Sequence, residues 1–380
     1  YEAALAVWQP LAEKGDRRAQ FYLGLCYEDG HGVPQSYAQA AHWYRKSADQ
    51  GYAPAQSNLG LLYYRGEGVE KDLDEAGKWF KKAADRGVPS AQANLAIMQV
   101  RREAPAANRH VPRRLLIKAA EQGDVSAQYT LGKLYQSEGI TRKSEVKAAA
   151  WMRAAAEAGF APAQNEYGMM KEDGRGTLAS VSDAAGWYKS AAEQGFAPAQ
   201  NNLALMYQKG KGVEQDLAEA RKWFAQAAEQ GEPEAQYSMG AMYYEARGVA
   251  RDYATARQWF EKAAEQSFGA ALHTLGVMHY RGEGVDRDFE KAHAYYHRAA
   301  EQGFSASQSN LALMYIAGIG VGQDYTTAAK WARAAAEQGR PEAQYTLGWM
   351  YRNGNGVAMS DREAARWYER GCELGSTRAC

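Results

Sequence analysis

Ala199-Gln-Asn-Asn-Leu-Ala-Leu-Met-Tyr207, followed by Lys209-Gly-Lys-Gly-Val213, is the stretch that decides the fold. Related stretches return every 36 residues along the whole chain. The leading residue, taken below as register position 0, recurs as Ala19, Ala55, Ala91, Ala127, Ala163, Ala199, Ala235, Ala271, Ser307, Ala343 and Ala379. Self-similarity at a period of 20–50 residues indicates a repeat array. We therefore predict one elongated solenoid whose units pack only on their neighbours.

The amino-acid composition argues against several classes of protein. The 380 residues are 46% hydrophobic and carry no net charge, which argues against disorder. A neutral chain also argues against nucleic-acid binding, which requires a concentrated basic face. We find no run of 18 or more apolar residues, so no segment is expected to insert into a membrane. Because the chain starts at Tyr1 rather than Met, the lack of a leader does not argue against secretion.

One unit shows how each repeat is built. A first helix is expected to begin near Pro54 and to end where Gly66 and Gly68 follow it, because proline suits a helix start and glycine a left-handed cap. Asp72 with Glu75 is typical of the N-terminus of a second helix. Apolar residues fall on one face of each helix, namely Ala55, Leu59, Gly60, Leu62 and Tyr63, then Ala76, Trp79, Phe80, Ala83 and Ala84.

Two recurring side chains are interpreted as core. Tryptophan recurs in the second helix as Trp43, Trp79, Trp151, Trp187, Trp223, Trp259, Trp331 and Trp367. Methionine recurs at register position 7 as Met98, Met170, Met206, Met242, Met278, Met314 and Met350. We expect residues 1–15 to form a half-repeat helix, residues 16–375 to form ten repeats in one domain, and residues 376–380 to start a further helix or a tail.

Two segments depart from the pattern. Residues 101–112 have lost both glycines, and Pro112 stands inside the expected second helix, so that helix must start late. Residues 136–144 are also irregular, and Leu115 replaces the tryptophan between them. Neutral drift and a partner-contacting loop both account for these departures.

The consensus resembles the Sel-1-like repeat family, a relative of the tetratricopeptide repeat. It reads Ala-x-x-x-Leu-Gly-x-x-Tyr-x-x-Gly-x-Gly-Val-x-x-Asp, then Ala-x-x-Trp-(Tyr/Phe)-x-Lys-Ala-Ala-Glu-Gln-Gly, with good copies at residues 55–87, 199–231 and 271–303. The resemblance implies an all-α fold, a right-handed superhelical α-solenoid of about ten helix-turn-helix repeats that acts as an adaptor or scaffold. Residues 4–16 are similar to the first helix of exported bacterial members.

The resemblance also bears on the cysteines. Residues 371–380 are similar to the cysteine-rich branch of the family, in which cysteines eight apart clamp successive helices. This similarity implies a Cys372–Cys380 disulfide and hence an oxidising compartment, the periplasm or the outside of the cell. Two free cysteines in small-residue positions are the alternative. Cys26 is expected to be an inert core thiol.

The sequence contains few residue patterns that could carry out catalysis or bind a metal. His273, His279, His293 and His297 share one repeat, and His293 and His297 have a spacing that can bind a metal. However, His279 takes a tyrosine position and the other three look partly exposed, so we expect packing or surface histidines and no metal. No phosphate-binding glycine loop, nucleophile motif or zinc-type cysteine cluster appears. We predict no enzyme and no cofactor.

The first helices line the concave face in solenoids of this kind. With positions 0, 4, 5 and 8 packed, a helical wheel leaves positions 2, 3, 6 and 9 on the opposite face. These positions are rich in amides, hydroxyls and tyrosines, which suit an extended peptide. The predicted partner-binding residues are Asn58, Asn94, Tyr129, Asn165, Asn202, Tyr237, Tyr244, His273, Asn310, Tyr345 and Trp349. A merely hydrophilic inner wall is the alternative.

These observations favour a non-enzymatic scaffold or adaptor. We predict a periplasmic or secreted protein that binds a protein or peptide on its concave face, with no nucleic acid and no membrane insertion; the sequence leaves the oligomeric state open. A secreted factor that engages a host protein is one alternative. An enzyme acting on cell-wall or β-lactam-like substrates is another, and it would need a converging nucleophile and base. An adaptor of the eukaryotic secretory pathway is disfavoured by the bacterial-looking first helix.

Overall fold

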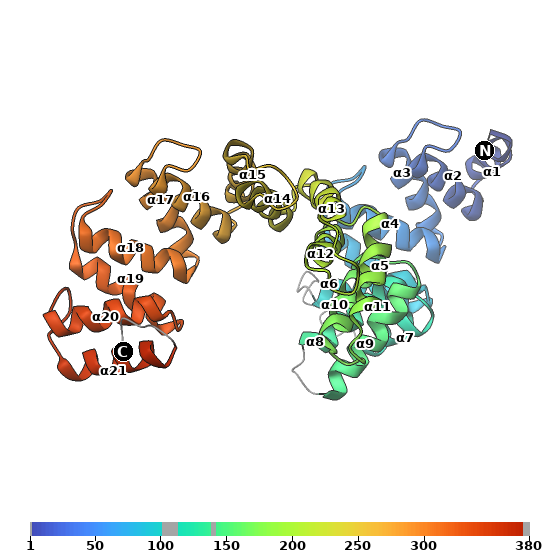
Figure 1. Ribbon diagram of the computed structural model, residues 1–380. Helices are drawn as coiled ribbons and strands as arrows, with labels where there is room; N and C mark the ends of the chain where they lie inside the picture. The colour runs from blue at the N-terminus through green and yellow to red at the C-terminus, as the bar shows by residue number, and fades with distance from the viewer. Residues whose placement is uncertain (1, 101–112, 138–141, 375–380) are drawn as a thin grey trace. The chain divides into compact units, whose positions relative to one another are not determined.

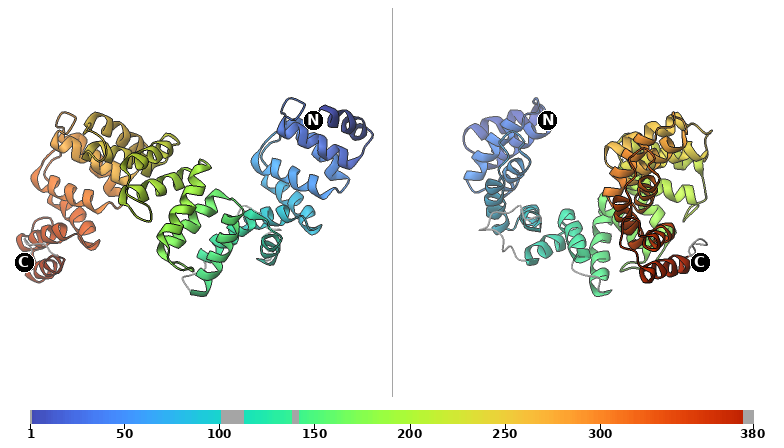
Figure 2. Two further views of the ribbon diagram at one scale, coloured as in Figure 1. Left: turned by 45° about the vertical axis from the view of Figure 1, so that its right-hand side comes forward. Right: turned by 90° about the vertical axis from the view of Figure 1, so that its left-hand side faces the viewer.

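The computed structural model describes residues 2–100, 113–137 and 142–374, which form helices and connecting turns without a strand (Figure 1). The predicted all-α solenoid is confirmed. The chain divides into two compact units, Tyr1–Trp187 and Tyr188–Cys380. Within each unit, successive helices pack side by side as hairpins, and each hairpin packs on the next (Figure 2).

The first unit holds one leading helix and then first and second helices in alternation. Their bounds are α1 Glu2–Glu13, α2 Arg17–Asp29, α3 Tyr37–Asp49, α4 Ala53–Arg65, α5 Leu73–Asp85, α6 Pro89–Val100, α7 Arg113–Glu121, α8 Val125–Ser137, α9 Arg142–Glu157 and α10 Ala161–Asp173. Helix α11, Val181–Glu193, contains the boundary between the units.

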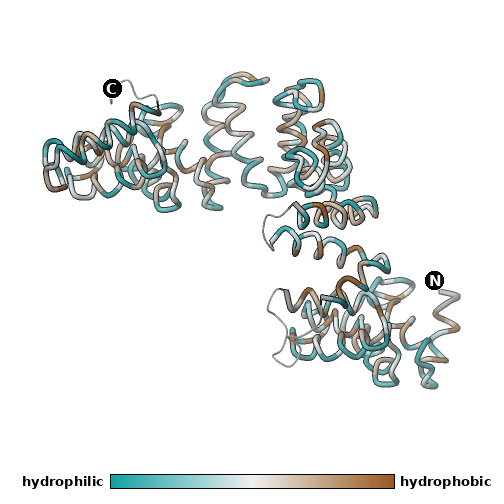
Figure 3. The backbone as a smooth tube through the Cα atoms, turned by 90° about the horizontal axis from the view of Figure 1, so that it is seen from below, coloured by the Kyte–Doolittle hydropathy of each residue, from teal (hydrophilic) through white to brown (hydrophobic). Residues whose placement is uncertain are grey.

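The second unit continues the alternation. Its helices are α12 Ala197–Lys209, α13 Leu217–Glu229, α14 Pro233–Glu245, α15 Tyr253–Glu265, α16 Gly269–Arg281, α17 Phe289–Glu301, α18 Ser305–Ala317, α19 Tyr325–Glu337, α20 Pro341–Asn353 and α21 Asp361–Glu373. Coloured by hydropathy, the backbone alternates between apolar and polar residues along the helices (Figure 3). Each helix therefore buries one stripe and leaves another in solvent.

Local chemistry sets the helix ends where the sequence predicts them. Helix α4 begins at Ala53 with Pro54 in its first turn, and Gly66 caps it with a left-handed φ of 78°. The Asp72 carboxylate accepts from the backbone N–H groups of Asp74 and Glu75, which satisfies donors that a helix start leaves unpaired.

The structure describes only the edges of the two segments that depart from the repeat pattern. Residues 101–112 and 138–141 lie outside the described residues. Helix α7 is described from Arg113 to Glu121, and because Pro112 lies outside the described residues, the late start predicted from it stays a prediction. Cys380 also lies outside the described residues, so the Cys372–Cys380 bond stays a prediction. Cys26 is a buried thiol, as expected, and burial raises its pKa.

Glycine at position 5 lets the two helices of a repeat touch. The ring of Phe260 lies directly over Gly240, and the ring of Tyr296 lies over Gly276. A Cβ atom on either glycine would come within 2.6 Å of that ring, well inside van der Waals contact. The predicted core is confirmed around these pairs, since the tryptophans pack in or against the core clusters and the position-7 methionines are at most 3% exposed.

A buried glutamine at position 1 joins each repeat to the one before it. Its side-chain amide donates to the backbone carbonyl of an alanine eight residues earlier, which is the second-last residue of the preceding second helix. The bonds are 3.0–3.2 Å long and run from Gln20, Gln56, Gln92, Gln128, Gln164, Gln200, Gln236, Gln308 and Gln344. We call this series the glutamine ladder. It adds a side-chain donor to carbonyls at the end of a helix, each of which also accepts a backbone N–H from the following turn.

In several repeats a second glutamine donates a hydrogen bond to the ladder glutamine. Gln266 donates to the Gln236 side-chain oxygen at 2.9 Å, and Gln50, Gln230 and Gln338 do the same in their repeats. The buried oxygens of Gln92, Gln128 and Gln344 have no hydrogen-bond donor; Ala158 and Leu374 stand at the second-glutamine position for the last two, whereas Gln122 stands there for Gln92.

One repeat replaces the ladder glutamine by another donor. Leu272 occupies position 1 there and is fully buried. The guanidinium of Arg298, from the following α17, donates to the carbonyl of Ala264 at 3.0 Å. Ala264 lies eight residues before Leu272, so its carbonyl keeps a side-chain donor, besides the backbone donors of the turn, although the glutamine is lost.

Candidate functional site

The candidate site is the first-helix surface, which we define as the side chains at positions 2, 3, 6 and 9 of the first helices. The helical wheel correctly leaves positions 3, 6 and 9 at least partly exposed in most repeats. Position 2 is the least exposed of the four, because its residues are half-buried at most and Ser57, Ala93, Asn165, Asn201 and Ser309 are buried. The first helix packs on its own second helix and on the neighbouring repeat, so its buried arc is wider than a single stripe allows.

The amides of the predicted set occupy different environments. Asn165 is only 7% exposed and its amide points at the sulfur of Met169, 3.9 Å away. Asn202 is half-buried, and Asn94 and Asn310 are half-buried side chains that line hollows in the surface. Their roles in partner binding stay predictions.

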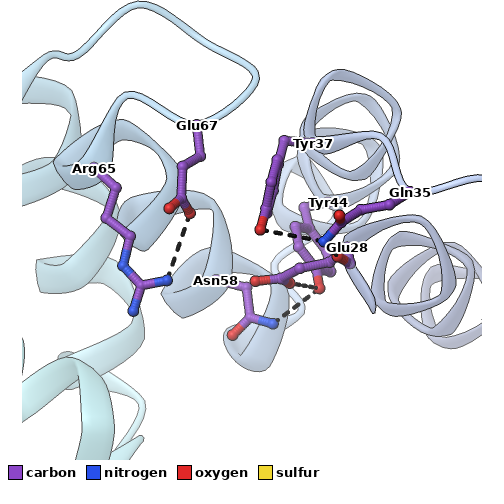
Figure 4. A network of polar contacts seen from close by, with 7 residues as sticks. All are labelled: Glu28, Gln35, Tyr37, Tyr44, Asn58, Arg65 and Glu67. Carbon is purple, nitrogen blue, oxygen red and sulfur yellow. Dashed lines mark hydrogen bonds and ion pairs between the residues drawn. The ribbon is translucent and has the colours of Figure 1, made fainter. Parts of the chain in front are cut away.

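Asn58 belongs to a polar network in the first unit (Figure 4). Its amide donates to the hydroxyl of Tyr44 at 3.1 Å, and that hydroxyl donates to the Glu28 carboxylate. Burial and the neighbouring carboxylate raise the pKa of Tyr44. Asn310 makes the equivalent hydrogen bond with Tyr296 in the second unit. One function of the position-3 asparagine is therefore to satisfy a buried tyrosine.

The aromatic members of the set pack against other rings. Tyr129 lies against Phe160, Tyr237 against Phe260 and Phe268, and Tyr345 against Tyr368. Trp349 packs on the core cluster of the last repeats. Tyr244 contacts Tyr253 and Phe260 and donates to Glu283, and burial with this hydrogen bond raises its pKa to about 12. Each of these side chains is half-buried, so it both stabilises its repeat and leaves an edge in solvent.

The histidine-rich repeat is a packing arrangement. His273 lies against Tyr296 and Phe304, with its Nδ1 2.8 Å from the Ser307 hydroxyl, and burial followed by the charge of Arg340 lowers its pKa to about 4. His279 is buried and stacks on Tyr295. Among the described residues, no three His, Cys, Asp or Glu side chains converge in a way that could hold a metal ion.

Sequence reasoning missed two matched hollows on the first-helix surface. One, of about 430 Å³, lies between α16, α17 and α18, and the other, of about 210 Å³, lies between α4, α5 and α6. Tyr280, Arg281 and Leu313 line the first and are absent from the predicted set. The signal was available as an exposed apolar residue at position 6 next to a Tyr-Arg pair at positions 9 and 10.

Comparison with known proteins settles the family. The Sel1 repeat model matches residues 17–52, 53–88, 89–124, 125–160, 161–196, 197–232, 233–268, 269–304, 305–339 and 341–376. The chain belongs to the Sel1 repeat family. Sel1 repeat proteins are generally protein-interaction scaffolds, and their solenoid is typically non-catalytic.

Solved structures agree with this assignment. The chain is similar to c5321, a protective antigen with an SLR fold present in uropathogenic Escherichia coli strains, at 35% identity and a TM-score of 0.74 over 99% of this chain and 80% of that one. It is also similar to a Sel1 repeat protein from Oxalobacter formigenes, at 32% identity and a TM-score of 0.57 over 64% of this chain and 96% of that one. No curated protein matches the chain. None of the described helices is both long and apolar enough to cross a membrane.

Proposed function

We propose that this Sel1 repeat protein is a non-enzymatic adaptor that binds a protein or peptide partner along the concave side lined by its first helices. The observation that carries the proposal is the recurrence of large exposed apolar side chains at matching positions of the first-helix surface. Met169 and Leu313, both at position 6, are 37% and 49% exposed, and Tyr280 at position 9 is 37% exposed. Single exposed apolar residues are ordinary, but several on one preformed surface are typical of an interaction site.

Matched substitutions test the proposal. The whole chain is used as bait for extracts of the source organism's envelope and culture medium. Leu313→Lys and Met169→Lys place a charge on the first-helix surface. Leu178→Lys and Met359→Lys make the same changes in turns, where the side chains are 86% and 72% exposed. We expect a partner that the first pair loses by about tenfold or more and the second pair retains, since burying an unpaired charge is unfavourable. A partner that binds all four variants equally contradicts the proposal.

We further propose that the adaptor works in the periplasm or outside the cell. The support is the Cys372–Cys380 pair of the sequence, because disulfides persist in oxidising compartments. Alkylation of the unfolded, non-reduced chain followed by intact-mass analysis should modify one cysteine, Cys26. Modification of all three cysteines would remove this support. The similarity to an antigen of uropathogenic Escherichia coli keeps a host protein among the candidate partners.

A further inference from the structure

The two hollows are copies of one another, six repeats apart. Each is closed on one side by the end of a first helix and on the other by the next first helix, with a second-helix ring, Phe80 or Tyr296, at its base. The matching lining pairs are Tyr64 and Tyr280, Arg65 and Arg281, Asn94 and Asn310, Ile97 and Leu313, and Met98 and Met314. In the full sequence, Tyr-Arg at positions 9 and 10 followed by asparagine at position 3 of the next repeat occurs only at these two places.

Both hollows are open to solvent; the walls of the larger one are mainly apolar, and those of the smaller one are apolar and polar in about equal share. Leu313 and Tyr280 at the larger hollow are 49% and 37% exposed, although each is a large apolar side chain. An open apolar depression of this size accommodates a side chain inserted from outside. It lacks the enclosure that a free fatty acid chain would require, because drug-sized and lipid ligands are mostly buried in their pockets.

The charged side chains at the rim of each hollow indicate which kind of ligand fits it. Each hollow is lined by one arginine and by no acidic residue. The side chains of Arg281 and Arg65 are 62% and 51% exposed, and each has a carboxylate, Glu283 or Glu67, at 3.5 Å from Nη1. Such a loose, exposed pair contributes little and leaves the other guanidinium N–H groups available. A ligand with a carboxylate next to its apolar group therefore complements the site.

We propose that these hollows are two equivalent docking sites, each of which takes one apolar side chain from an acidic segment of a partner protein and binds the adjoining carboxylate with Arg65 or Arg281. This inference rests on the proposed adaptor function and names the chemistry of its partner. Asn310 and Asn94 lie beside each site, where a side-chain amide can pair with the backbone of the bound segment. Two copies of one site let a partner with two such segments gain affinity by binding both.

Methyl-labelled protein and a minimal probe test the proposal. The probe is acetyl-Leu-Asp-amide, titrated into the full chain while the methyl signals of Met98 and Met314 are followed by NMR. We expect saturable shifts at both methionines with a dissociation constant on the order of millimolar, as befits a ligand of this size. Acetyl-Gly-Asp-amide, which lacks the apolar side chain, and acetyl-Leu-Asn-amide, which lacks the charge, should bind more weakly.

The duplication supplies an internal control. Arg281→Gln should weaken probe binding about threefold at Met314, the effect of an exposed ion pair, and leave binding at Met98 unchanged. Arg65→Gln should do the reverse. Each variant keeps one intact site, which reports that the repeats around that site stay folded.

Several outcomes overturn the proposal. These are no saturable shift at Met98 and Met314, equal binding of the leucine and glycine probes, and equal binding of the aspartate and asparagine probes. Shifts induced by hexanoate but not by the dipeptide would assign the hollows to a lipid instead. Concentration-dependent shifts without any probe would assign them to a second copy of the chain. A partner that is lost with Leu313→Lys while the probe fails to bind would retain the adaptor function and reject only these docking sites.

Discussion

Removing the Arg298 guanidinium should show how much the hydrogen bond that replaces one ladder glutamine contributes to the free energy of unfolding. Arg298→Ala deletes the side-chain donor to the Ala264 carbonyl, which then keeps only the backbone N–H donors of Gln266 and Ser267 beside the fully buried Leu272. Losing one hydrogen bond at a carbonyl that keeps other donors costs about 0.5–1.5 kcal/mol. For a cooperative unit of this size, we expect the melting temperature to fall by about 2–8 °C.

Leu272→Gln should rescue this variant. In other repeats the glutamine at position 1 reaches the same carbonyl, as Gln236 reaches Ala228 at 3.2 Å. Leu272→Gln alone should destabilise the protein, because it loses leucine burial while Arg298 still satisfies the carbonyl. In the Arg298→Ala background it should restore the bond, which gives a coupling energy of about 1 kcal/mol between the two changes.

Urea unfolding followed by circular dichroism measures the four free energies, and hydrogen exchange of amides in α15 and α16 shows whether the loss is local. Repeat arrays do not always unfold in one step, so the local measurement is the more direct one. A coupling energy near zero, or an Arg298→Ala variant as stable as the parent, would refute the assignment of Arg298 as a substitute for the ladder glutamine.

Two further predictions concern packing and pH. Gly276→Ala should destabilise the protein by about 1–3 kcal/mol in urea unfolding, because the new Cβ would lie 2.6 Å from the Tyr296 ring. Gly186→Ala is the control: its new Cβ has no neighbour within 4 Å, so it should be neutral or stabilising by up to about 1 kcal/mol. Equal effects of the two substitutions would contradict the packing of the ring on the glycine. His273 has its folded pKa lowered to about 4 from 6.5, so the unfolded chain binds a proton that the folded chain does not between these values. Stability should therefore fall as pH drops from about 6.5 to 4, by up to roughly 3 kcal/mol, and His273→Gln should flatten this part of the pH profile; an unchanged profile would contradict it.

The period of the sequence was sufficient for the fold. The helix ends at Gly66 and Asp72 and the buried methionines follow from local residue types and spacing. The side of each first helix that faces a neighbouring repeat could not be read in the same way. A helical wheel drawn for one helix does not include contacts with the next repeat, so it placed Asn165 in an open groove although this side chain is buried.

The glutamine ladder shows a second limit. Gln200 stands in the stretch that defines the period, yet its residue type suggests a surface side chain. Its role depends on a carbonyl at the end of the preceding second helix, 3.2 Å from its amide, and only the packing of the two helices reveals that contact. The paired hollows were missed for a related reason. Each is built from side chains of two successive repeats, so no single repeat displays the site.

The gaps in the ladder also have a mechanical consequence. A repeat array held by its two ends carries the same tension through every boundary between repeats, so it yields first where the fewest cross-links resist shear. The boundary of Gln128 has lost the second glutamine donor, because Ala158 stands in its place. Under load, the contact of Gln128 with the preceding repeat is thus expected to open before a doubly linked contact such as that of Gln236, and the contact of Gln344 shares this weakness.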